Sequence, residues 1–180
     1  MNADRVGFEI TPIRLSHVAA FRRAFDAVAR ERRFLAAFEA PSLDETRRYV
    51  EERMACCDPM VVAIGADALV GWCDIGRNSV PSRRHRGVLG MGVIADWRGQ
   101  GVGAALLTAA LDLASRRDFI RIELDVHADN AAAIALYEKF GFVREGVQCD
   151  GALIDGRFVD VVLMGRVDRV AGGKNAPGVR

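Results

Sequence analysis

The chain has 180 residues, 25 basic against 24 acidic side chains and 51% hydrophobic residues. This balance is typical of one globular domain and argues against a general nucleic-acid or membrane-surface binder, which would carry a basic excess. The apolar runs fall short of the roughly 18–20 residues that cross a bilayer, and no secretory signal is visible at the N-terminus, so we expect a cytoplasmic protein.

The first half of the chain predicts one strand, two helices and three more strands. Ser16 is a candidate cap for a helix that extends to about Arg33, and Ser42 with Glu45 forms a capping-box pattern for a second helix. A tight turn is expected between two strands at residues 66–67. The expected strands are residues 7–15, 60–65, 68–75 and 88–94, the last of which contains Gly90 and Gly92.

The second half predicts a helix, a strand, a short helix and two closing strands. Residues 103–114 place apolar side chains on one helical face, and residues 119–129 alternate between apolar and polar side chains. A short helix starts at Asn130 and stops near Gly141, and residues 142–147 and 156–167 close the sheet. The order predicts a mixed α/β sheet in a single domain over residues 1–168, and residues 169–180 are expected to be disordered.

Three glycines lead into the helix expected at residues 103–114, the third of them as its first residue, in the stretch Arg98-Gly-Gln-Gly-Val-Gly103. Glycine lets backbone N–H groups converge on one point, and the first N–H groups of a helix lack internal partners and carry the positive end of its dipole. A phosphate satisfies both features. The stretch fits neither a P-loop nor a dinucleotide fingerprint, and a flexible turn at a helix start remains the alternative.

Arg98, Gly101 and Gly103 fit the pattern Q/R-x-x-G-x-G/A, which resembles the acyl-coenzyme A pyrophosphate loop of the GNAT acetyltransferase superfamily. The stretch LGMGVIADW before it resembles that superfamily's bulged strand, and DNAAAIALYEKFGFVREG after it resembles a second hallmark. The resemblance covers about residues 60–167. It implies a mixed, mostly antiparallel central sheet of about seven strands with about four helices packed on it.

The resemblance also implies acetyl-CoA as co-substrate, with no metal, and it assigns roles to individual residues. The bulged strand is expected to leave free main-chain groups near Val93. Tyr137 matches the general acid that protonates the leaving thiolate, although a packing tyrosine is the alternative, and Asn130 matches a cofactor contact that can equally be a helix cap. The implied cofactor-binding residues are Met91, Val93, Arg98, Gly99, Gln100, Gly101, Val102, Gly103, Ala104, Asn130 and Tyr137.

The general base is left open, because the stretch HRGVLGMGV carries no acid where the family often has a carboxylate. Candidates are Asp74, His85, His127 and Glu39, and water alone is a further possibility. On the acceptor side, Phe34 and Glu39 could supply an apolar wall and a carboxylate for an amine. The candidate substrate residues are Phe34, Glu39, Asp74 and His127.

Within the superfamily, the chain is most similar to bacterial enzymes that acetylate amino acids or related small amines. Two other functions stay open. One is a protein N-terminal or lysine acetyltransferase, which predicts an open groove between the substrate-side helices and the closing hairpin. The other is a non-catalytic acyl-coenzyme A sensor. We expect a small-molecule amine as partner, no nucleic acid and no membrane, and a homodimer is possible.

Overall fold

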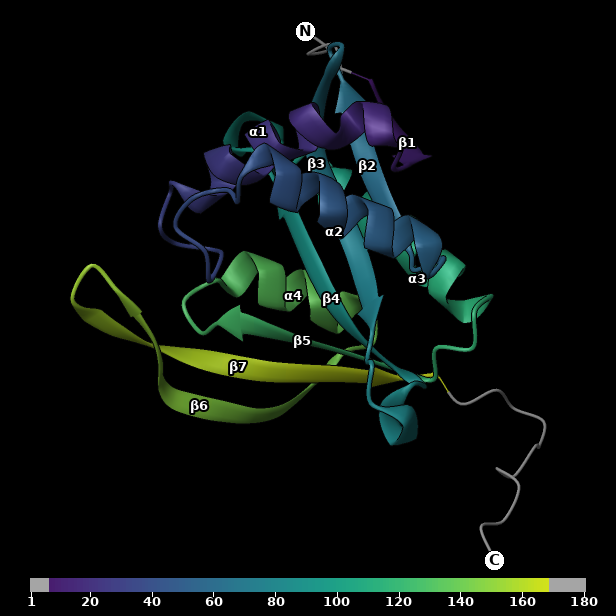
Figure 1. The fold of residues 1–180 in the computed structure, drawn as a ribbon. Helices are drawn as coiled ribbons and strands as arrows, with labels where there is room; N and C mark the ends of the chain where they lie inside the picture. The colour runs from purple at the N-terminus through teal and green to yellow at the C-terminus, as the bar shows by residue number, and fades with distance from the viewer. Residues whose placement is uncertain (1–6, 169–180) are drawn as a thin grey trace, which may run out of the picture.

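Residues 7–168 are described by a computed structural model of the chain. They form a seven-stranded sheet in the order β1-β2-β3-β4-β5-β7-β6, in which only β4 and β5 are parallel neighbours (Figure 1). This confirms the predicted mixed, mostly antiparallel sheet with four helices. The elements are β1 (Phe8–Pro12), α1 (Val18–Ala29), α2 (Leu43–Ala55), β2 (Met60–Gly65), β3 (Ala68–Arg77), β4 (Arg86–Val93), α3 (Val102–Ser115), β5 (Arg121–His127), α4 (Ala131–Lys139), β6 (Val143–Ile154) and β7 (Arg157–Val167).

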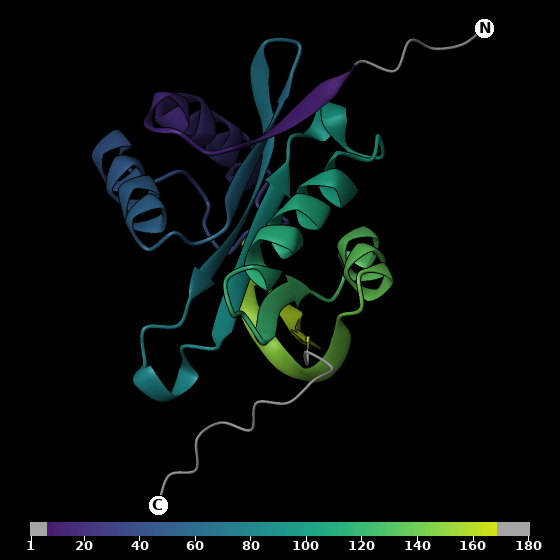
Figure 2. The ribbon, with the colours of Figure 1, turned by 90° about the vertical axis from the view of Figure 1, so that its right-hand side faces the viewer.

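The helices cover both faces of the sheet (Figure 2), with α1 and α2 on one side and α3 and α4 on the other. Each side has its own apolar cluster, one around Phe21 and Trp72 and the other around Leu106 and Phe142. Among residues 7–168, no helix combines the length and apolar character that crossing a membrane requires. The single domain over residues 1–168 stays a prediction, and the tail at 169–180 lies outside the described residues.

Local signals set most of the element boundaries. The predicted capping box forms, because Glu45 N–H donates to Ser42 Oγ at 3.3 Å and Ser42 N–H donates to Glu45 Oε2 at 2.9 Å. The predicted turn at Ala66 and Asp67 has φ above zero at both residues, as a tight hairpin needs. Buried side chains of α3 follow the predicted face, from Leu106 and Leu107 to Ala114.

The first helix differs from its prediction at both ends. A 3-10 turn covers Leu15–His17, so Ser16 lies inside that turn and does not cap α1. The prediction extends the helix to about Arg33, but α1 ends at Ala29. The segment after it turns back to α1, where Asp26 Oδ1 accepts from the Ala40 N–H at 2.9 Å.

The parallel pair β4 and β5 separates along its length. The two strands pair only from Arg86–Val88 to Arg121–Glu123, although β4 continues to Val93 and β5 to His127. Figure 1 shows β5 and β7 running away from β3 and β4 beyond this shared end. On its other edge, β4 pairs with β3 in unbroken register from Gly71–Val93 to Arg77–Gly87, so the bulge expected in β4 is absent from that pairing. The sheet therefore opens because β4 and β5 stop pairing after three residues, and not because of a bulge between β3 and β4.

Candidate active site

The separation of β4 from β5 opens a cavity of about 520 Å³, which we call the cofactor cavity. Its walls come from β4, β5, the turn before α3, helix α4 and the segment after α1. Most of the predicted cofactor residues line it, namely Met91, Val93, Arg98, Gly99, Gly101, Gly103, Ala104, Asn130 and Tyr137. Gln100 and Val102 do not, because Gln100 Nε2 donates to the Asp96 carbonyl at 2.6 Å and the Val102 side chain is buried in the core.

The glycine turn before α3 has the backbone of an anion site. Gly99 and Gly101 have φ of 71° and 87°, and a Cβ at either position would meet no atom within 4 Å. The backbone angle, and not crowding, therefore calls for glycine here. Gly101 is the N-cap of α3 without a side-chain cap, and the first turn carries no acid, so the helix directs unpaired N–H groups and a positive dipole end at the turn. These features fit a pyrophosphate.

Arg98 begins this turn, but its charge is already paired. Its two terminal nitrogens donate to the Glu31 carboxylate at 2.7 and 2.5 Å, and its Nε donates to the Val93 carbonyl at 2.8 Å. The guanidinium also lies 4.6 Å from the centre of the Phe34 ring. Arg98 thus ties the end of β4 to the segment after α1, and the Val93 carbonyl expected to be free is occupied.

Helix α4 brings Asn130 and Tyr137 to the cofactor cavity. Asn130 is the N-cap of α4, since its Oδ1 accepts from the Ala133 N–H at 3.2 Å, and it lines the cavity as well. The Tyr137 side chain is 7% exposed and its ring lies 5.8 Å from that of Phe142. Burial raises the pKa of the Tyr137 phenol above its ordinary value, so the hydroxyl stays protonated at neutral pH and can donate.

A second cavity of about 320 Å³ lies on the opposite face, between α1, α2 and β3; we call it the acceptor cavity. Four of its ten lining residues are aromatic, and Asp74 is the buried carboxylate among them. Its lining residues are Phe21, Arg22, Phe25, Ala40, Pro41, Glu45, Thr46, Tyr49, Trp72 and Asp74.

Gly90 and Gly92 of β4 lie where the cofactor cavity and the acceptor cavity are adjacent. A Cβ at Gly92 would lie 2.3 Å from the Trp72 ring, and a Cβ at Gly90 would lie 3.3 Å from Asp74 Oδ1. Asp74 and Gly90 are also register partners between β3 and β4. Gly90 lines the cofactor cavity and Asp74 lines the acceptor cavity, so the two share a wall at this point.

The Asp74 carboxylate is held by Tyr49, a contact between α2 and β3. The Tyr49 hydroxyl donates to Asp74 Oδ2 at 2.5 Å. Burial raises the pKa of Asp74 to about 6, against the opposing effects of the Tyr49 hydrogen bond and the Arg53 charge. Burial and the Asp74 charge raise the pKa of Tyr49, which keeps its hydroxyl a donor.

The other acceptor-side candidates lie elsewhere. Phe34 lines the cofactor cavity, and Glu39 lines neither cavity, being exposed and 3.8 Å from Arg30. His127 is buried, and its Nδ1 lies 2.8 Å from the Arg33 carbonyl. His85 lies outside both linings and precedes β4 at the end where β4 and β5 are paired. Sequence reasoning missed Tyr49, because no local pattern links it to a residue 25 positions away.

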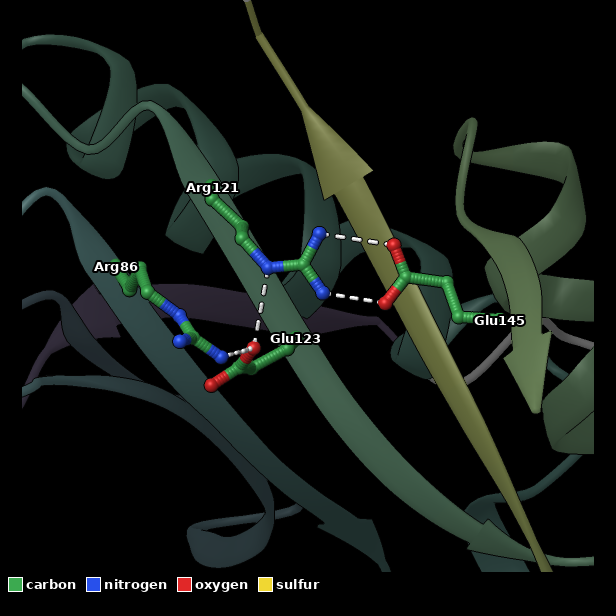
Figure 3. A network of polar contacts seen from close by, with 4 residues as sticks. All are labelled: Arg86, Arg121, Glu123 and Glu145. Atoms are coloured by element: carbon green, nitrogen blue, oxygen red, sulfur yellow. Dashed lines mark hydrogen bonds and ion pairs between the residues drawn. The ribbon is translucent and has the colours of Figure 1, made fainter. Parts of the chain in front are cut away.

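Charged side chains cross the strands at the closed end of the β4–β5 separation (Figure 3). Glu123 of β5 pairs with Arg86 of β4 and with Arg121, and Arg121 pairs with Glu145 of β6. Figure 3 shows the last pair passing over β7. Gly165 of β7 makes this possible, since a Cβ there would lie 2.6 Å from Glu145 Oε1. The network joins the strands where the opening begins.

No group of three or more His, Cys, Asp or Glu side chains within residues 7–168 is arranged to hold a metal ion. The groups that the structure brings together at the site are a backbone anion cradle, a protonated phenol, and a buried carboxylate in a cavity with four aromatic residues. Proton transfer and carbonyl polarisation are the chemistry that these groups can provide.

Comparisons with known proteins relate the chain to acetyltransferases. The L-amino acid N-acetyltransferase AaaT of Escherichia coli K12 is 38% identical over 111 residues, which are 60% of this chain and 67% of that protein. The [Ribosomal protein bS18]-alanine N-acetyltransferase of the same strain is 49% identical over 47 residues, 26% of this chain and 32% of that protein. A phosphinothricin acetyltransferase from Sinorhizobium meliloti, solved with acetyl-CoA, superimposes with a TM-score of 0.87 at 18% identity, covering 96% of this chain and 95% of that one.

The family model described as "Acetyltransferase (GNAT) family" matches residues 25–142, which include every lining residue of the cofactor cavity and all of the acceptor cavity's except Phe21 and Arg22. The glycine turn, Asn130 and Tyr137 all lie within this range. The chain belongs to the GNAT acetyltransferase family, and it is an N-acetyltransferase that uses acetyl-CoA.

Proposed function

We propose that the chain acetylates the primary amine of a small molecule, with an amino acid as the leading class, and that the amine binds in the acceptor cavity. The observation that carries this proposal is the size and chemistry of that cavity. At about 320 Å³ it is at the lower end of small-molecule sites, and its walls are largely apolar, with four aromatic residues among ten. The relation to the amino-acid N-acetyltransferase supports the same class.

In this proposal the turn at Gly99–Ala104 holds the pyrophosphate through backbone N–H groups, and Asn130 faces the arm that leads to the thioester. Acetyl-CoA supplies the acetyl group as a thioester. Tyr137 holds its proton because burial raises its pKa, and it donates that proton to the leaving sulfur. These residue roles are consistent with the cavity lining.

A protein N-terminus is the second candidate acceptor, favoured by the relation to the ribosomal-protein acetyltransferase. An extended peptide needs an open groove between the α1–α2 segment and the β6–β7 hairpin. Arg32 of the first pairs with Asp155 of the second, so this ion pair joins the two segments between which a peptide would have to lie. The contact favours the small molecule. A homodimer and a cytoplasmic location stay predictions.

The test is thiol release from acetyl-CoA with a panel of amino acids, polyamines, aminoglycosides and short peptides. We expect turnover with free amines and none with peptides. Turnover with peptides alone contradicts the proposal in favour of a protein acceptor. Binding of acetyl-CoA by calorimetry, with no thiol release from any amine, contradicts it in favour of the non-catalytic sensor.

A further inference from the structure

The structure assigns a proton acceptor to this reaction: we propose that the Asp74 carboxylate takes the proton from the acceptor's amine, and that Tyr49 positions it. The inference rests on the proposed function, because it requires an amine in the acceptor cavity. It adds a catalytic residue on β3 and a positioning residue on α2, neither of which the comparisons assign.

The first argument is position. β4 from Arg86 to Val93 contains no acid, so a carboxylate beside the thioester must come from a neighbouring element. Asp74 is the register partner of Gly90, and the missing Cβ of Gly90 leaves Asp74 Oδ1 against the main chain of β4. An amine that touches this oxygen from the acceptor cavity therefore lies at the wall shared with the cofactor cavity.

The second argument is that the two carboxylate oxygens of Asp74 differ in their hydrogen bonding. Tyr49 donates to Oδ2 at 2.5 Å, while no residue of the described range 7–168 donates to Oδ1. The hydrogen bond fixes the carboxylate in one orientation. It leaves the oxygen nearer to β4 free to accept a proton, as a base requires.

The third argument is the electrostatic surroundings. From α2, Tyr49 and Arg53 face Asp74, and Arg53 donates to Asp58 Oδ2 at 2.8 Å, which offsets its charge. At the cavity, Arg22 of α1 and Glu45 of α2 complete the charged lining. Burial dominates this balance and raises the pKa of Asp74 to about 6, so the group is ionised yet basic enough to work at neutral pH.

The proton balance is complete without any other reactant. The acceptor enters as an ammonium ion and gives one proton to Asp74, which releases it to water after turnover. The nitrogen forms its bond to the acetyl carbon as the carbon–sulfur bond breaks. Tyr137 gives its proton to the sulfur, and the second proton lost by the nitrogen restores the phenol.

The experiment compares Asp74→Asn, Tyr49→Phe and the control Glu52→Gln, which changes an exposed acid on α2. Thiol release is measured from about pH 5 to 9 with the most active amine of the panel, together with the Kd of acetyl-CoA. Asn preserves the size of Asp74 and can still accept from Tyr49, so the fold is retained. The Tyr49→Phe substitution removes only the hydroxyl that lowers the pKa of Asp74.

For the wild type we expect kcat/KM to rise with pH through about 6. Asp74→Asn lowers kcat by about 10²–10⁴-fold and removes this rise, with the Kd of acetyl-CoA unchanged. Tyr49→Phe moves the midpoint to higher pH and retains most of the activity on the high-pH plateau. Glu52→Gln leaves the profile in place.

If kcat/KM of Asp74→Asn still rises with pH through about 6, the proposal is overturned. A raised KM of Asp74→Asn with unchanged kcat also overturns it, because this would show that Asp74 only binds the ammonium ion. A Tyr49→Phe profile with an unmoved midpoint removes the positioning role, even where stability drops. Absence of thiol release with every amine overturns the proposed function and this inference together. Activity that is indifferent to Asp74 overturns this inference alone.

Discussion

The turn before α3 has a left-handed backbone at Gly101 and lies at the positive end of the helix dipole. Replacing Gly101 by Asp or by Asn separates the effect of the backbone from the effect of charge. The two substitutes have the same size and are the residues that best tolerate a left-handed backbone after glycine. Gly101 has φ of 87°, and a Cβ there meets no atom within 4 Å, so both variants carry the same strain and no clash. They differ only in one negative charge at the N-terminus of α3.

The strain costs about 1–2 kcal/mol in either variant and affects acetyl-CoA binding about equally. The charge affects binding in the Gly101→Asp variant alone. For a phosphate charge about 5 Å from the carboxylate at an effective dielectric constant of about 20, Coulomb repulsion is about 3 kcal/mol, or about 10²-fold in Kd. We therefore expect Gly101→Asp to bind acetyl-CoA about 10²-fold more weakly than Gly101→Asn.

The assay is calorimetric titration of both variants with acetyl-CoA at low and high salt, with thermal unfolding to confirm that both fold. Screening predicts that the difference between the variants narrows as salt increases. Equal Kd values for Gly101→Asp and Gly101→Asn at low salt refute the assignment of the pyrophosphate to this turn.

Three further predictions concern single residues. Tyr137→Phe should lower kcat by about 10²-fold or more with the Kd of acetyl-CoA unchanged; full turnover removes its role as acid. Gly92→Ala, whose Cβ would lie 2.3 Å from the Trp72 ring, should lower the free energy of unfolding by about 1–3 kcal/mol in urea titrations, whereas Gly7→Ala, with open space around it, should not. Folding raises the pKa of Asp74 from 3.8 to about 6, so the unfolded state releases its proton first and the unfolding free energy should fall by about 2 kcal/mol as pH rises from about 4 to 6. In Asp74→Asn the unfolding free energy should depend less on pH between about 4 and 6. If its pH dependence is unchanged, groups other than Asp74 cause it.

The elements and the glycine turn could be predicted because their signals are local. The capping box at Ser42 and the positive φ at Gly99 and Gly101 depend on neighbouring residues alone. Asn130 shows how two predictions can both hold, since it caps α4 and lines the cofactor cavity. Periodicity likewise placed Leu106 on the buried face of α3.

Contacts between distant segments could not be predicted in this way. Glu31 lies 67 positions from Arg98 in the chain and pairs with it. The Arg98 guanidinium, which the local pattern indicates as a phosphate contact, is therefore already paired with a carboxylate. Tyr49 reaches Asp74 only because α2 packs across β3. Gly90 and Gly92 both line the cofactor cavity, but the sequence does not show that Asp74 and the Trp72 ring occupy the space where side chains at these positions would lie.

The most direct measurement is the kcat of Gly90→Ala beside its Kd for acetyl-CoA. The added methyl group lies 3.3 Å from Asp74 Oδ1, in the wall where the amine and the acetyl group are proposed to meet. We predict a loss of kcat of about 10-fold or more with the Kd unchanged, as expected when reacting groups are moved apart by about 1 Å. An unchanged kcat would mean that transfer takes place away from this wall.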